Sequence, residues 1–161
     1  MFTGDGSDGM GSSDFLARAL HRTGFANQAS SRSREDGYEL KDAYVTAICR
    51  CAPPDNRPLP DEIAACGDFL AEELRLLKNV RAIVALGKLA FDQTLRLLVA
   101  RGAVLPRPRP AFSHGARIEW GEPWPVLLGS YHPSRQNTQT KRLTPAMLEE
   151  VFQAAREIAS H

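Results

Sequence analysis

Hydrophobic residues along this chain follow a helical period in four stretches and form nearly unbroken runs between some of them. Spacings of three and four residues predict amphipathic helices over 13–24, 60–77, 87–98 and 144–158. The ends of these stretches carry suitable residues, because Ser13 and Thr144 can cap a helix N-terminus and Pro60 suits a first turn. The pattern therefore predicts four helices with one apolar face each.

Three other segments have the composition of β-strands. Residues 80–86 and 126–131 are nearly continuous apolar runs, which are typical of strands covered on both faces. Residues 44–51 are rich in β-branched side chains and lack a helical period. Strands that alternate with helices predict an α/β fold, with a mostly parallel central sheet flanked by helices in three layers. The loops that follow two of these strands, 51–56 and 132–137, are then expected at the edge of the sheet where such folds carry their sites.

Length and composition favour one domain. With 161 residues, 43% of them hydrophobic, the chain can bury a single core, so we expect one domain over 1–161. Residues 4–14 are rich in Gly, Ser and Asp and predict a flexible loop, and residues 102–125 predict irregular structure. The sequence has no apolar run of about eighteen residues and no signal-peptide pattern, which predicts a cytoplasmic protein without membrane contact.

The charge balance limits how the protein can meet nucleic acid. Lys and Arg exceed Asp and Glu by one residue, which leaves a net charge of +1. A protein with this balance has no overall attraction to DNA, so any DNA contact must come from local patches. Residues 134–142 form one such patch, whose donors suit phosphate oxygens and base edges, although a solvated loop has the same composition. These donors are Ser134, Arg135, Gln136, Lys141 and Arg142.

Three kinds of side chain are candidates for chemistry. Cys51 and Cys66 could be two metal ligands, but Cys66 lies on the apolar face of its predicted helix and also fits an inert thiol. His132 follows a predicted strand and precedes Pro133, where an imidazole either faces a cleft or makes structural hydrogen bonds. Asn56 follows two prolines and by itself is typical of a turn.

Four motifs, taken together, favour a functional role for these candidates. They are Phe2-Thr3-Gly4-Asp5, Arg50-Cys51-Ala52-Pro53-Pro54-Asp55-Asn56, Val84-Ala85-Leu86-Gly87 and Ser130-Tyr131-His132-Pro133-Ser134-Arg135-Gln136-Asn137. In order and spacing they resemble the family-5 (type b) uracil-DNA glycosylases, and the resemblance covers nearly the whole chain. It implies a monofunctional DNA-repair enzyme that hydrolyses the N-glycosidic bond of uracil, or of another deaminated base, flipped out of DNA.

The resemblance also assigns roles to individual residues. Phe2 would stack on the flipped base, and Asn56 would bind its polar edge. Asp5 would act on the sugar side, orienting water and offsetting positive charge, while His132 would donate to the base oxygen that gains negative charge. Asn137 would support this wall of the pocket. Residues 134–142 would enter the DNA beside the lesion, with Arg135 and Lys141 on phosphates.

The sequence departs from the family in two ways. Family members hold a [4Fe-4S] cluster on four cysteines, and Cys51 and Cys66 resemble two of these. The upstream Cys-x-x-Cys pair and the first core strand of the family have no counterpart here, and Cys49 does not supply the missing ligands. We therefore expect a chain truncated at its N-terminus, with its first strand missing and its cluster incomplete.

Three functions are consistent with these features. The first is a monomeric glycosylase acting on DNA that contains uracil or other deaminated bases. The second is a catalytically inactive remnant that binds DNA, and the third is a metal-binding scaffold of the same fold. Excision of uracil from an oligonucleotide separates the first from the others.

Overall fold

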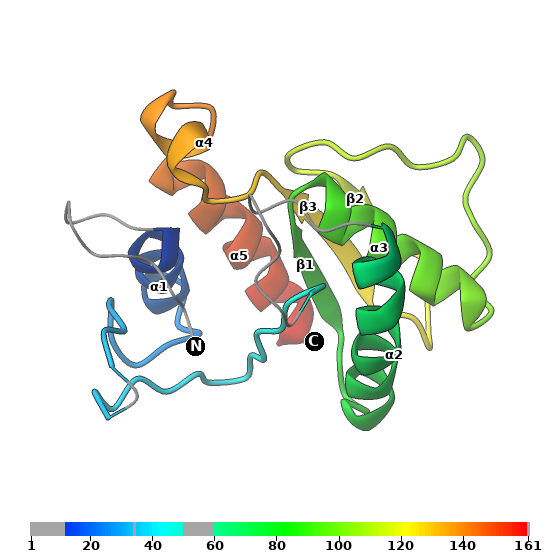
Figure 1. Ribbon diagram of the computed structural model, residues 1–161, viewed down its shortest axis with the longest axis horizontal. Helices are drawn as coiled ribbons and strands as arrows, with labels where there is room; N and C mark the ends of the chain where they lie inside the picture. The colour runs from blue at the N-terminus through cyan, green and yellow to red at the C-terminus, as the bar shows by residue number, and fades with distance from the viewer. Residues whose placement is uncertain (1–11, 34, 50–59, 161) are drawn as a thin grey trace.

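The computed structural model describes residues 12–33, 35–49 and 60–160 (Figure 1). The elements, in chain order, are α1 (Ser12–Arg22), α2 (Pro60–Leu76), β1 (Ala82–Leu86), α3 (Lys88–Ala100), β2 (Arg117–Ile118), β3 (Val126–Ser130), α4 (Arg135–Gln139) and α5 (Pro145–Ala159). In this part of the chain, no helix is both long and apolar enough to cross a membrane.

The three strands form one sheet in the order β1-β3-β2. Strands β1 and β3 are parallel, with Ala82 opposite Val126 and Leu86 opposite Ser130, and α3 lies between them in the sequence. Parallel neighbours require such a crossover, so this unit confirms the predicted α/β fold. Strand β2 is short and antiparallel to β3, and it lies inside the segment that was predicted to be irregular.

Helices cover both faces of the sheet (Figure 1). Leu127 and Leu128 are neighbours in β3 and therefore point to opposite faces, yet both are buried. Leu128 packs in a cluster with residues of α1 and α5, whereas Leu127 packs with Phe91 and Leu95 of α3. Burial on both faces explains the unbroken apolar runs in the sequence, and it gives the three layers that were predicted.

The predicted helix ends are largely confirmed. The Thr144 hydroxyl accepts a hydrogen bond from the Met147 N–H at 3.3 Å and caps α5. Gly24 has a φ of 79° just beyond α1, and its N–H donates to the His21 carbonyl at 3.1 Å, which closes that helix. Ser13 was predicted to be a cap, but it lies within α1, which begins at Ser12.

The strand predicted over 44–51 is wrong for residues 44–49, which have no strand pairing; residues 50 and 51 lie outside the described ranges. Side chains attach this segment to α2 instead, because Tyr44 and Thr46 donate to the Glu73 carboxylate at 3.0 and 2.5 Å. A strand needs a partner for its backbone groups, and β1 pairs only with β3 among the described strands. The β-branched composition was therefore insufficient without a neighbouring strand.

Candidate functional site

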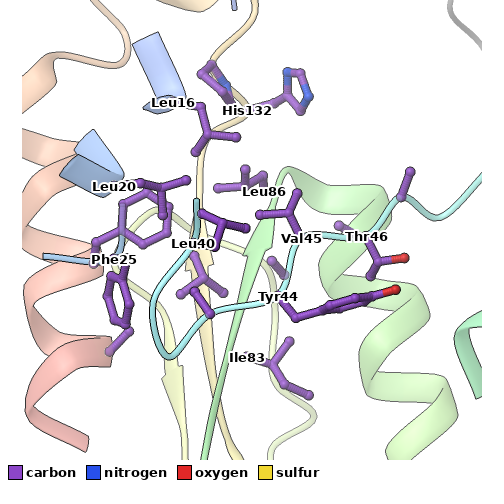
Figure 2. Close-up of a pocket in the computed structure, with 18 of the residues that line it drawn as sticks. Leu16, Leu20, Phe25, Leu40, Tyr44, Val45, Thr46, Ile83, Leu86 and His132 are labelled. Atoms are coloured by element: carbon purple, nitrogen blue, oxygen red, sulfur yellow. The ribbon is translucent and has the colours of Figure 1, made fainter. Parts of the chain in front are cut away.

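A cleft of about 3280 Å³ opens beside β1. Leu16 and Leu20 of α1, Val45 and Leu86 line it, and His132 lies at its end (Figure 2). Small-molecule pockets measure about 300–1,000 Å³, so the described residues form a wide groove rather than a base-sized pocket. The predicted site residues Phe2, Asp5, Cys51 and Asn56 lie outside the described residues. Their convergence with His132 stays a prediction.

The end of β3 and the start of α3 together place His132. The Gly87 N–H donates to the Ser130 carbonyl at 2.7 Å, and Gly87 has a φ of 95°. A Cβ atom at residue 87 would lie 3.4 Å from the His132 Cβ. Gly87 therefore combines a left-handed backbone with close approach to His132, both of which suit glycine. Two of the sequence motifs, 84–87 and 130–137, thus meet at the carboxyl end of the sheet.

A short helix fixes the residues after His132. The segment 134–142 was predicted to be a loop, but Arg135–Gln139 form α4, and the Ser134 hydroxyl accepts from the Asn137 N–H at 3.4 Å as its cap. The Asn137 side-chain amide then donates to the His132 carbonyl at 2.9 Å. Ser134 is three residues before Asn137, the spacing of a helix cap, so this turn could have been found in the sequence.

Basic side chains surround this turn. Arg135, Gln136 and Lys141 line the same cleft as His132, and all three are exposed. The Arg142 guanidinium lies 4.6 Å from the centre of the Tyr131 ring, a cation–π contact that restrains it next to the His132 turn. The predicted DNA-contacting residues therefore gather on one rim, except that the Ser134 hydroxyl is used as a helix cap.

His114 was missed by the sequence reasoning. It lies in the segment 102–125, and its Nδ1 accepts from the Tyr131 N–H at 3.3 Å and lies 3.4 Å from the Ser130 Oγ. Its ring stacks on Tyr131, with centroids 5.2 Å apart and planes at 28°. The only signal in the sequence was a histidine between Ser113 and Gly115 in an otherwise irregular stretch. Its contacts with β3 could not be inferred from local pattern.

The cysteines do not form a complete cluster site. Cys49 and Cys66 are half-buried, and within 12–33, 35–49 and 60–160 no group of three or more His, Cys, Asp or Glu side chains is placed to hold a metal. The sequence has three cysteines, whereas a [4Fe-4S] cluster takes four thiolates. The cysteines of this sequence alone therefore do not fit that group.

Loss of solvent around part of the ring lowers the pKa of His132 from its ordinary value of 6.5. As the pH falls, the unfolded chain therefore binds a proton at residue 132 at a higher pH than the folded chain does. We expect the wild type to lose more unfolding free energy than His132→Gln as the pH falls through the interval from 6.5 down to the lowered pKa. Urea unfolding of both proteins from pH 8 to pH 5 measures this difference. Parallel losses would contradict the lowered pKa.

The fold and this turn define a class of protein. The chain belongs to the uracil DNA glycosylase superfamily, whose sequence model matches residues 1–156. Within it, the chain is similar to type-5 uracil-DNA glycosylases. The one from Mycobacterium tuberculosis is 45% identical over 99% of this chain, and the one from Thermus thermophilus is 42% identical over 98%. A type-4 enzyme from Archaeoglobus fulgidus is 31% identical over 61%. The chain spans 56%, 67% and 48% of these relatives.

Proposed function

We propose that this chain excises uracil from DNA by hydrolysing the N-glycosidic bond of a flipped nucleotide. The observation that carries this proposal is the turn at 132–137, where Asn137 restrains the His132 carbonyl beside the exposed rim of Arg135 and Lys141. Similarity to type-5 glycosylases across 98–99% of the chain supports the same activity. The class of reaction is base excision, with other deaminated bases as further candidate substrates.

In the proposed reaction, the bond between C1′ of the sugar and N1 of uracil breaks, and its electron pair stays on the base. A His132 with a lowered pKa is neutral at pH 7, and its N–H donates to the uracil oxygen that gains negative charge. Positive charge develops on the sugar, where Asp5 offsets it and orients water for addition to C1′. Phe2 stacks on the base and Asn56 binds its polar edge. The products are free uracil and an abasic site.

The direct test is a duplex oligonucleotide with one uracil, incubated with the purified chain and then cleaved by alkali at abasic sites. We expect product from the uracil strand and none from a matched thymine strand. Asn56→Ala should lower kcat/KM by at least about tenfold, because the polar edge of the flipped base loses a hydrogen-bond partner. Binding of uracil DNA without product would favour the inactive remnant. A protein that carries metal and does not bind DNA would favour the scaffold.

The basic rim should act on all DNA alike. Because a phosphate contact releases about one counterion, Lys141→Gln should weaken binding of uracil and thymine duplexes equally and reduce the slope of log K against log salt by about 1. Arg101→Gln is the control. Arg101 is an exposed cation at the C-terminal end of α3, whereas His132 lies next to the N-terminal end of that helix. Fluorescence anisotropy between 50 and 200 mM salt, the range over which such slopes are usually read, gives both slopes. A loss confined to uracil DNA would exclude a phosphate contact.

The cofactor and location follow from the same proposal. We propose that Cys51 and Cys66 correspond to two of the four thiolate ligands of a [4Fe-4S] cluster, and that the cysteines of this sequence alone leave the cluster incomplete. The iron content of the purified chain decides this point. We propose that the protein acts on DNA in the cytoplasm, with the nucleoid, and that it does so as a monomer.

A further inference from the structure

The edge of β3 continues beyond β2 by pairing with residues 113–116. The Gly115 N–H donates to the Gly129 carbonyl at 2.8 Å, and the Gly129 N–H donates to the Ala116 carbonyl at 2.8 Å. A Cβ atom at residue 129 would lie 2.7 Å from the Ser113 carbonyl oxygen, a distance that real Cβ atoms essentially never show. Gly129 therefore allows this segment to lie directly on β3.

That close approach brings His114 to the start of the His132 turn. Its Nδ1 accepts the Tyr131 N–H at 3.3 Å, and because an amide N–H can only donate, Nδ1 carries no proton in this arrangement. The His114 ring also stacks on Tyr131, and Phe112 contacts the same tyrosine edge to face at 6.2 Å. Side chains from 112–114 thus restrain both the backbone and the ring of Tyr131.

His132 is then held from both sides. The N–H of the residue before it is bound by His114, and its own carbonyl is bound by the Asn137 amide at 2.9 Å. The two restraints come from segments far apart in sequence, one before β2 and one in α4. Tyr131 also contacts the Arg142 guanidinium, so the residue that His114 restrains also touches one of the basic side chains around the turn.

We propose that His114 is a positioning residue, which fixes the backbone conformation of the His132 turn through its hydrogen bond to the Tyr131 N–H. The effect on catalysis rests on the proposed role of His132 in uracil excision, whereas the effect on the turn does not. His114 does not touch the substrate in this scheme. Its imidazole sets where the His132 ring lies when the base enters.

The test compares variants that differ in the acceptor at the Nδ1 position. His114→Ala removes the acceptor, while His114→Asn places an amide oxygen near the former Nδ1. His114→Gln carries its amide one carbon farther out and keeps the bulk without an acceptor there. His21→Ala is the control, because it removes an exposed histidine from α1. If His114→Ala does not fold, the Asn and Gln variants still give the comparison.

Two measurements report on the turn itself. In His114→Ala and His114→Gln we expect the Tyr131 amide to exchange with solvent about tenfold faster, as for one lost hydrogen bond. We also expect the pKa of His132, followed by NMR titration, to move back towards 6.5 as its ring gains solvent. His114→Asn and His21→Ala should match the wild type. Unchanged exchange and unchanged His132 titration in His114→Ala would overturn the proposal, as would failure of Asn to differ from Gln.

A kinetic measurement reports on the consequence. With uracil duplex, His114→Ala should lower kcat by about tenfold and leave KM within about twofold, because a displaced His132 loses contact mainly in the transition state. An equal loss of binding would overturn the positioning role. If the wild-type chain does not excise uracil, the proposed function fails, while amide exchange and the His132 titration still decide whether His114 fixes the turn.

Discussion

Replacing His132 with alanine should lower the rate of uracil excision by about 10²–10³, the usual effect of removing a donor aimed at developing negative charge. The dissociation constant for uracil DNA should change less than about threefold, because the charge on the base oxygen exists mainly in the transition state. The turn should survive, since the Asn137 amide binds the main-chain carbonyl of residue 132 and not its side chain. Single-turnover cleavage and anisotropy titration measure the two quantities.

The controls separate loss of the donor from disturbance of the turn. His132→Gln keeps a donor and should retain more activity than alanine, while His21→Ala, on the exposed side of α1, should match the wild type. Equal losses of binding and rate in His132→Ala would contradict the assigned role.

The local sequence pattern was sufficient to predict those elements whose apolar residues mark the surface that they bury. The helices α2 and α5 were predicted from their helical period, and the parallel strands β1 and β3 from their nearly unbroken apolar runs. Residues 44–49 show where this reasoning fails. Their composition favours a strand, but a strand also needs a neighbour, and here the Glu73 carboxylate binds their side chains instead.

The site was predictable only in part for a similar reason. His132, Asn137 and the basic residues lie within eleven positions of one another, from 132 to 142, so a local resemblance was enough to mark them as candidates. His114 meets Tyr131 across seventeen positions, and the contact depends on Gly129 allowing the Ser113 carbonyl to approach the strand. Such a contact depends on the packing of two backbones, which periodicity and composition do not encode.

The second large effect that we expect is a loss of stability when the core beneath the site is truncated. Phe91 of α3 is fully buried and meets Phe112 edge to face at 5.6 Å, and Phe112 in turn contacts Tyr131. Phe91→Ala should therefore lower the free energy of unfolding by about 3–5 kcal/mol, the cost of a large aromatic cavity in a close-packed core. Urea unfolding followed by circular dichroism measures it, with the slope of the transition checked against the wild type.

Leu89→Ala is the matched control, because Leu89 is on the same helix but 38% of its surface is exposed. We expect a smaller loss there than in Phe91→Ala, since Leu89 is already partly exposed and less buried area disappears. Phe91→Leu should fall between the two, and it keeps enough stability to examine the site. Because Phe91 contacts Phe112, which in turn contacts Tyr131, the Tyr131 amide should exchange faster in Phe91→Leu than in Leu89→Ala. Equal Tyr131 exchange in these two variants would show that the packing of Phe91 does not affect the His132 turn.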